Sequence, residues 1–104
     1  MQKFIKALSM KSIPEGSGTS IDIEGKSLAV FNISGQFYAM DNTCAHRGGP
    51  LGEGSLEGQE VTCPWHGWQY NVVTGACSTN PAAGQKIYKT KVEGDDVLIE
   101  IDTD

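Results

Sequence analysis

Two short segments, each with a cysteine close to a histidine, constrain this chain more than any other feature. Cys44 and His46 are separated by one residue, and Cys63 and His66 by two. Sixteen residues lie between the two segments, and the chain has no other histidine. Each segment therefore offers one thiolate and one imidazole, and the fold has to bring two tight turns together around one centre.

This donor set fits a binuclear iron–sulfur cluster. In a [2Fe–2S] cluster with mixed ligands, soft thiolates hold one ferric ion and neutral imidazoles hold the other. The short spacings allow each turn to present both side chains on one side of the backbone, so that two turns clamp the cluster from opposite flanks. The sequence therefore predicts one [2Fe–2S] cluster per chain, with the ligands Cys44, His46, Cys63 and His66.

Three other interpretations of these residues stay open. Structural zinc also accepts two cysteines and two histidines, although its usual spacing pairs cysteine with cysteine and histidine with histidine. A catalytic cysteine–histidine pair usually has its members far apart in sequence. Ordinary core or surface histidines are the simplest alternative, but here both histidines of the chain lie beside a cysteine. The pattern favours the cluster.

Residues 42–75 resemble the Rieske family. The matching segments are C-A-H-R-G at 44–48 and C-P-W-H-G-W-Q-Y at 63–70. The resemblance implies an all-β fold with a base domain of sandwich or partly open barrel type. It places this base domain at residues 1–41 and 78–104, and an inserted cluster-binding subdomain with two ligand loops at residues 42–77.

Short alternating segments separated by turn signals independently predict an all-β chain. Thr19–Glu24 and Leu28–Ile33 flank Gly25 and predict a hairpin, and Ile87–Val92 with Val97–Ile101 predict a terminal hairpin that pairs with the early strands. No window of eleven or more residues keeps a helical period. The other expected strands are Lys3–Leu8, Phe37–Met40, Glu60–Thr62 and Gln69–Val73, and one helical turn is expected before Pro14.

Glycine is dense between the two cysteine–histidine segments. Its spacing does not match the pattern G-x-G-x-x-G, and we expect no helix to begin there, which argues against a phosphate site. Glycine lets the backbone approach another group closely because it has no Cβ. We therefore expect these glycines to bring backbone N–H groups toward the cluster sulfurs; they are Gly48, Gly49, Gly52 and Gly54.

Composition limits the class of protein and of partner. The 104 residues suffice for one domain but not for a separate catalytic domain. The net charge of −5 argues against nucleic acid or an anionic membrane as a partner, and favours a basic protein surface. No apolar run has the length of a transmembrane helix, and the first residues do not look like a signal peptide. Three cysteines, an odd number, argue against a disulfide framework, so we expect a cytoplasmic protein.

The resemblance also bears on the reduction potential. Rieske proteins of respiratory complexes have an extra cysteine in each ligand loop, and these two form a disulfide; the matching positions here are Gly49 and Trp65. The high-potential proteins have a serine that donates toward a bridging sulfide, where this chain has Trp68. Tyr70 matches the family's tyrosine whose hydroxyl bonds a cysteine sulfur. The resemblance thus implies a low potential, about −150 mV, at the bottom of the Rieske range.

Four further residues have two interpretations each. Cys77, which has no histidine nearby, is expected to be a buried small apolar residue, with a free surface thiol as the alternative. Arg47 either contacts a partner or forms a salt bridge with a carboxylate such as Glu53. Trp65, between two predicted ligands, is expected to be exposed and to take part in docking, with ordinary core packing as the alternative. Trp68 lies either at the cluster rim or in the core.

The family resemblance implies an electron carrier and not an enzyme. We expect a soluble, monomeric Rieske ferredoxin that passes single electrons from a flavin reductase to the terminal oxygenase of an aromatic-ring dioxygenase system, and docks with each transiently. A mononuclear iron site with two histidines and a carboxylate would require further histidines. Two alternatives stay open: a small Rieske subunit of an assimilatory nitrite reductase, and an interaction module that senses redox state or is stabilised by zinc.

Overall fold

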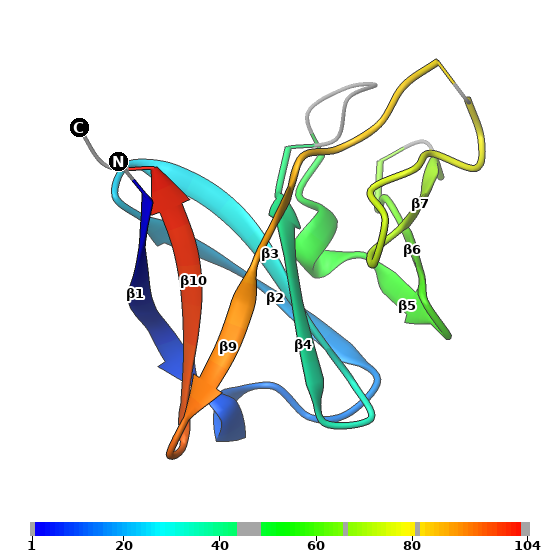
Figure 1. The fold of residues 1–104 in the computed structure, drawn as a ribbon. Coiled ribbons are helices and arrows are strands. Elements are labelled where there is room, and N and C mark those ends of the chain that lie inside the picture. Colours follow the sequence, from blue (N-terminus) through cyan, green and yellow to red (C-terminus); the bar gives the residue numbers. More distant parts are fainter. Residues whose placement is uncertain (1, 44–48, 66, 81, 103–104) are drawn as a thin grey trace.

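Antiparallel strands make up almost all of the regular structure in the computed structural model, which describes residues 2–43, 49–65, 67–80 and 82–102 (Figure 1). The strands are β1 (Gln2–Ser9), β2 (Ser17–Ile23), β3 (Lys26–Ile33), β4 (Gln36–Asp41), β5 (Ser55–Glu57), β6 (Glu60–Thr62), β7 (Gln69–Asn71), β8 (Ile87–Tyr88), β9 (Thr90–Glu93) and β10 (Asp96–Asp102). Two short 3₁₀ helices, η1 (Met10–Ser12) and η2 (Leu51–Glu53), are the other regular elements of these ranges. The prediction of an all-β chain is confirmed.

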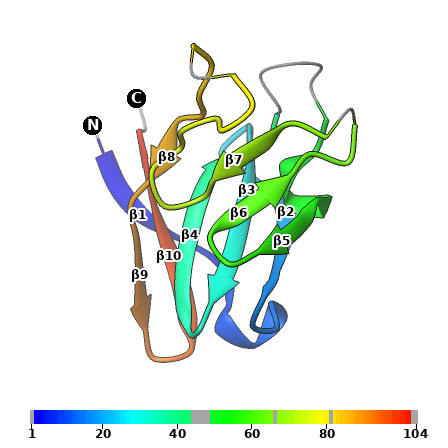
Figure 2. The ribbon, with the colours of Figure 1, turned by 90° about the vertical axis from the view of Figure 1, so that its right-hand side faces the viewer.

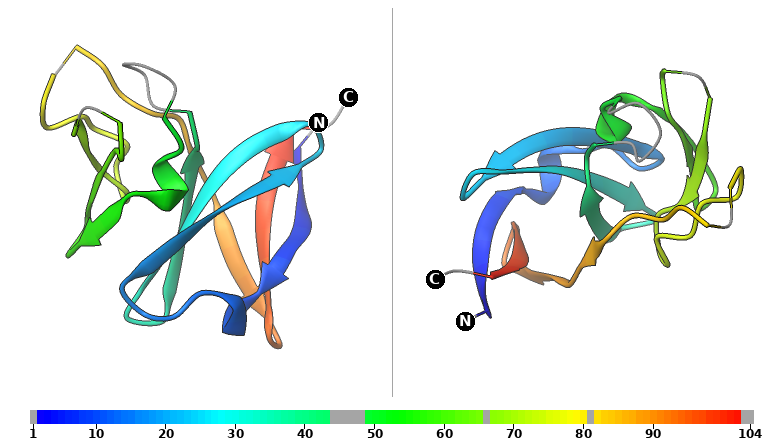
Figure 3. Two further views of the ribbon diagram at one scale, coloured as in Figure 1. Left: turned by 180° about the vertical axis from the view of Figure 1, so that it is seen from behind. Right: turned by 90° about the horizontal axis from the view of Figure 1, so that it is seen from above.

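The strands form three sheets, which follow one another across the molecule (Figures 1 and 3). One sheet has the order β1-β10-β9, the second β2-β3-β4-β8 and the third β5-β6-β7, and every strand pair is antiparallel. The second sheet lies between the other two, as the views from the front and from behind both show. Among the described residues no helix is long and apolar enough to cross a membrane.

The central strand β3 is buried on both faces, and this separates two cores. Leu28–Asn32 are all buried, and alternate side chains of the strand point to opposite faces of the sheet. We call the core toward the third sheet the site core; it consists of Ala29, Phe31, Met40, Leu51, Val61, Cys63, Tyr70, Val72 and Cys77. The base core, toward the first sheet, consists of Ile13, Leu28, Val30, Phe37, Ala39, Val97, Ile99 and Ile101.

Figure 2 looks onto the third sheet, with β3 and β4 behind it. The site core fills the space between these layers, since it takes residues from β3 and β4 as well as from β6 and β7. The third sheet is built from residues 55–71, and the other two sheets from residues 2–41 and 87–102. The predicted division into a base domain and a cluster-binding subdomain stays a prediction, and the two parts share the site core.

Most strand predictions are confirmed. The first hairpin is β2 with β3, where Ile23 pairs with Lys26 across a two-residue turn. Its turn residues Glu24 and Gly25 both have positive φ, as the favoured two-residue hairpin turn requires. At the other end of the chain, β10 pairs with β9 and with β1, so the terminal hairpin returns to the first strand as expected.

The prediction of a single strand over Ile87–Val92 is wrong. This stretch changes sheets at Lys89: β8 pairs with β4, and β9 pairs with β10. Its alternating pattern is continuous, but the two halves find partners in different sheets, which no local pattern reveals. The chain therefore links the second sheet to the first at this point.

Two further differences concern the third sheet. The predicted strand Gln69–Val73 ends at Asn71, because the side-chain carbonyl of Asn71 accepts hydrogen bonds from the backbone N–H groups of Val73 and Thr74, at 2.8 and 3.1 Å. Strand β5 was not expected, because Leu56 is its only apolar residue. It forms through pairing with β6, where Leu56 lies opposite Val61.

Candidate metal centre

Cys63 lies at the end of β6, where the chain enters the tip of the β6–β7 hairpin. Thr62 pairs with Gln69, and the backbone N–H of Cys63 donates to the carbonyl of Trp68 at 2.7 Å. Cys63 therefore directly follows the expected strand Glu60–Thr62, at the tip of a hairpin whose second strand begins at Gln69. The Cys63 side chain is only 2 % exposed and belongs to the site core. The other predicted ligands Cys44, His46 and His66 lie outside the described residues, as do Gly48 and Arg47.

Gly49, at the end of the predicted first ligand loop, lies against the predicted second ligand loop that begins at Cys63. A Cβ on Gly49 would lie 2.7 Å from Cys63 Sγ, closer than Cβ atoms approach other atoms, and 3.1 Å from Trp65 Cβ, which is an unusually tight contact. The absence of a side chain at residue 49 is therefore what permits this contact. Since the described end of the first loop meets the sulfur of the second, the residues present fit a centre held between the two loops. Positions 49 and 65 are the two that the resemblance matches to the bridged cysteines of respiratory Rieske proteins, and they lie close together in this structure.

Gly52 and Gly54 serve a different purpose from the one predicted. A Cβ on Gly52 would lie 2.5 Å from the carbonyl oxygen of Thr19, and one on Gly54 would collide with the carbonyl oxygen of Thr62. Their N–H groups donate within the protein: that of Gly52 to the side chain of Asn42, at 2.8 Å, and that of Gly54 to the carbonyl of Leu51, at 3.0 Å. These two glycines therefore pack η2 against the neighbouring strands and do not direct N–H groups to a cluster.

Asn42 joins the residues before and after the predicted first ligand loop. Its amide group donates to Ser27 Oγ at 3.1 Å, and its side-chain carbonyl accepts from Ser20 Oγ at 3.1 Å and from the N–H of Gly52 at 2.8 Å. Its backbone carbonyl accepts from the N–H of Leu51 at 2.8 Å. Asn42 is 6 % exposed, so these bonds satisfy a buried polar side chain. The residue before the loop is thus fixed to the residues after it.

A contact between side chains links β8 to the end of β4. The hydroxyl of Tyr88 donates to the carboxylate of Asp41 at 2.6 Å, and the N–H of Asp41 donates to the carbonyl of Lys86 at 2.9 Å. Burial, with the hydrogen bond to Asp41 and its charge, raises the pKa of Tyr88 well above that of an ordinary tyrosine. The hydroxyl therefore stays protonated and keeps donating at neutral pH.

The remaining cysteine and the aromatic residues near the site are placed as follows. Cys77 is 4 % exposed in the site core, and its sulfur accepts from the N–H of Asn80 at 3.4 Å, which confirms the prediction of a buried residue. Trp65 is 51 % exposed, as expected; its role in docking stays a prediction. Trp68 is half-buried and packs against the site core, in agreement with core packing. Tyr70 is fully buried in that core, and its bond to a cysteine sulfur stays a prediction.

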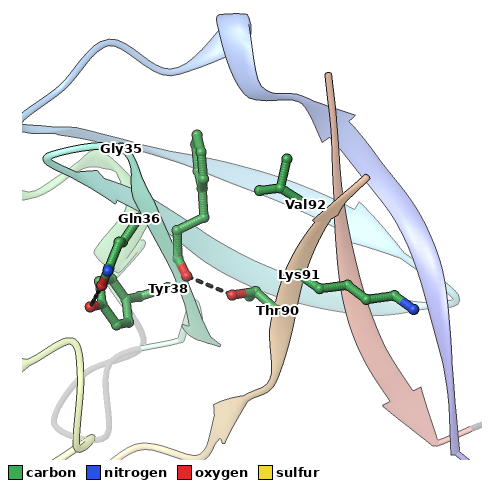
Figure 4. A pocket seen from close by; sticks show the side chains of 7 residues that line it. Gly35, Gln36, Tyr38, Thr90, Lys91 and Val92 are labelled. Atoms are coloured by element: carbon green, nitrogen blue, oxygen red, sulfur yellow. Dashed lines mark hydrogen bonds between the residues drawn. The ribbon is translucent and has the colours of Figure 1, made fainter. Parts of the chain in front are cut away.

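The structure also has an open groove away from this site. Figure 4 shows Gly35–Tyr38 on one side and Thr90–Val92 on the other, where Thr90 Oγ1 donates to the carbonyl of Phe37 at 2.6 Å. None of the residues that line this part of the groove is a cysteine, a histidine or a carboxylate. It therefore lacks the donors that a metal centre needs.

Comparison with known proteins identifies the family. Residues 3–98 match the Rieske [2Fe-2S] domain. The chain belongs to the Rieske [2Fe–2S] domain family. The cofactor of this Rieske chain is therefore a [2Fe–2S] cluster, and neither the zinc site nor the catalytic cysteine–histidine pair is supported.

Similar proteins cover this Rieske chain almost from end to end. The ferredoxin component of the naphthalene 1,2-dioxygenase system of Pseudomonas aeruginosa is 38 % identical over 101 residues, which are 96 % of this chain and 97 % of the relative. A chain in the complex of reduced oxygenase and oxidized ferredoxin in carbazole 1,9a-dioxygenase superposes with a TM-score of 0.84 at 30 % identity, covering 92 % of this chain and 91 % of the other.

A nitrite reductase small subunit has the same fold. The structure of the putative NADH-dependent nitrite reductase small subunit from Mycobacterium tuberculosis superposes with a TM-score of 0.89, over 99 % of this chain and 98 % of the other. The sequence identity is only 17 %, so this likeness shows the fold alone. It gives no support to the nitrite reductase alternative beyond the shared architecture.

Proposed function

We propose that this chain is the Rieske ferredoxin of an aromatic-ring dioxygenase system, which receives single electrons from a flavin reductase and passes them to the terminal oxygenase. The observation that carries this proposal is the end-to-end similarity to dioxygenase ferredoxin components, with 38 % identity over 97 % of the Pseudomonas aeruginosa relative. A similarity confined to one domain of a larger enzyme would not have this coverage. The chain thus has the size of the carrier itself.

The proposed ligands are Cys44 and Cys63 for one iron, and His46 and His66 for the other. The support is the pattern of the two segments and the contact of Gly49 with the sulfur of Cys63. When bound, the cluster supplies one-electron exchange, and its two neutral imidazoles raise the potential above that of an all-cysteine cluster. The protein fixes the loops and buries the thiolate of Cys63.

The number of histidines argues for a carrier and against an oxygenase. A terminal oxygenase needs two histidines for the Rieske cluster and two more for a mononuclear iron site. This chain has two histidines in all, and the proposed cluster uses both. One-electron transfer to a separate catalytic protein is therefore the chemistry that these residues support.

Charge and exposure indicate how the partners dock. The net charge of −5 favours partner surfaces that are basic, and complementary charge speeds the encounter of carrier and partner. Trp65, half exposed beside the hairpin tip, offers an apolar contact close to Cys63. A monomer in the cytoplasm that binds each partner transiently fits a carrier, because the carrier has to leave one partner before it meets the next.

Stopped-flow spectroscopy tests this function. We expect the reduced protein to be reoxidised on mixing with the oxidised oxygenase of a naphthalene 1,2-dioxygenase system, at a rate that falls as the salt concentration rises. The apoprotein serves as the control and should transfer no electron. A tight one-to-one association with a nitrite reductase, together with no transfer to an oxygenase, would contradict the proposal.

The reduction potential is expected to be about −150 mV, at the bottom of the Rieske range. Position 68 carries no hydroxyl to donate to a sulfide, and the surrounding protein is acidic. The reduced, more negative cluster is therefore less stabilised than in the high-potential proteins that have a serine at this position. Protein-film voltammetry measures this value, and a potential above about +100 mV would contradict it. Trp68→Ser should raise the potential above that of Trp68→Ala, since both variants lose the indole and only the first gains a hydroxyl.

A further inference from the structure

The side chain of Gln85 holds the backbone at the start of the first ligand loop. Its amide nitrogen donates to the carbonyl of Asp41 at 3.0 Å and to the carbonyl of Thr43 at 2.6 Å. A glutamine amide group has two N–H donors, one for each of these carbonyls. Asp41 is the last residue of β4, and Thr43 directly precedes Cys44. The amide thus fixes the backbone that leads into the proposed ligand.

The backbone of Gln85 is connected to β7, the strand that follows the second ligand loop. Its N–H donates to the carbonyl of Gly75 at 2.8 Å, and the N–H of Gly75 donates to the carbonyl of Asn71, the last residue of β7, at 2.8 Å. Gly84 forms an antiparallel bridge with Ala76. Gly75 has φ +83°, and a Cβ there would collide with the carbonyl oxygen of Gln85, so glycine permits this close approach.

We propose that Gln85 is a positioning residue that sets the placement of the first ligand loop relative to the second, and through it the retention and the potential of the cluster. Its backbone is joined through Gly75 to the end of β7, the strand that follows the second ligand loop. Its side chain is bonded at the end of β4, the strand that precedes the first ligand loop. This inference rests on the proposed ligands Cys44 and Cys63. Groups that orient the ligands of a metal centre tune its affinity and its potential.

Other contacts hold this region together without Gln85. Asn42 joins the two ends of the first loop, and β8 pairs with β4 at Ala39 and Met40. Loss of the Gln85 amide should therefore leave the fold intact and release only the backbone at residues 41 and 43. A merely structural role would instead lower the thermal stability and leave the cluster unchanged.

Tyr88→Phe provides a matched control. The Tyr88 hydroxyl is also bonded to Asp41, from the strand that follows Gln85, but it contacts the carboxylate and not the loop backbone. Gln85→Leu removes both donors at nearly constant volume, and Gln85→Glu replaces them with oxygens that face two carbonyls. If Gln85→Leu does not fold, Gln85→Asn gives the same test, since it keeps the amide and shortens the reach by one methylene.

The experiment compares these variants with the wild-type holoprotein by rate of iron loss to a chelator, midpoint potential, EPR g-values of the reduced cluster and thermal unfolding. We expect the Gln85 variants to lose iron about tenfold faster and to show shifted g-values and a shifted potential, and Tyr88→Phe to match the wild type in all three. Wild-type values for Gln85→Leu, whatever its melting temperature, would overturn the inference. A wild-type protein without a Rieske spectrum would instead overturn the ligand assignment itself, and this inference with it.

Discussion

Replacing Cys63 with alanine is expected to give a colourless protein that holds no [2Fe–2S] cluster. In the proposed assignment two thiolates bind one iron, and Cys63→Ala removes one of them. Neither water nor a backbone group replaces this thiolate in a site this buried. Iron and inorganic sulfide per chain, together with the visible absorption spectrum, measure the result.

Cys77→Ala is the matched control for this substitution. Cys63 and Cys77 are both buried in the site core, at 2 and 4 % exposure, so the two variants lose a similar apolar contact. Each is expected to lower the stability of the apoprotein by about 1 kcal/mol, a usual cost for one substitution. Only Cys63→Ala should lose the cluster. Iron retained in Cys63→Ala, or lost in Cys77→Ala, would contradict the assignment of the ligands.

The hairpins could be predicted because their signals are local. The turn at Glu24 and Gly25 separates two alternating segments, and the observed pairing of Ile23 with Lys26 follows directly from that pattern. The hairpin tip that carries Cys63 was predictable for the same reason, since short strand patterns lie on both sides of it. In each case the residues that decide the structure are neighbours in the chain.

The pairing of distant segments could not be predicted in this way. The break at Lys89 arises because β8 and β9 have partners in different sheets, and strand β5 exists only because β6 lies beside it. The burial of β3 on both faces likewise requires two further sheets. These features depend on tertiary packing, which overrides local preference.

The difference between local signals and distant contacts also separates the proposed ligands from the residues that support them. A candidate metal ligand is indicated by its residue type and spacing, as Cys63 is. The side chain of Asn42 acts on two serine hydroxyls and one backbone N–H, and that of Gln85 acts on carbonyls that are 44 and 42 positions away in the sequence. An amide side chain has too many ordinary roles for its residue type to reveal this one. Only the structure shows which carbonyls it meets.

Gly49→Ala is expected to weaken cluster binding strongly, because in this chain the Cys63 sulfur and Trp65 pack closely against residue 49. The added methyl carbon would lie 2.7 Å from Cys63 Sγ and 3.0 Å from Trp65 Cγ. A free side chain would move aside, but a sulfur bonded to iron has little freedom to move. Overpacking of this kind costs about 1 to 3 kcal/mol. We therefore expect most of the purified protein to lack iron, as measured by iron content and the EPR signal of the reduced form.

Gly84→Ala separates this effect from the general cost of replacing glycine. A Cβ on Gly84 would meet only the carbonyl oxygen of Gly75, at 3.4 Å, which is ordinary van der Waals contact. Gly84→Ala should therefore keep a full complement of iron. In the apoprotein of Gly49→Ala the Cys63 sulfur is able to move aside but the contacts with Trp65 stay, so only a modest fall in the unfolding temperature is expected. Full iron content in Gly49→Ala would mean that the Cys63 sulfur is not held by a cluster at that position, and the arrangement of the two loops proposed for this Rieske chain would have to be abandoned.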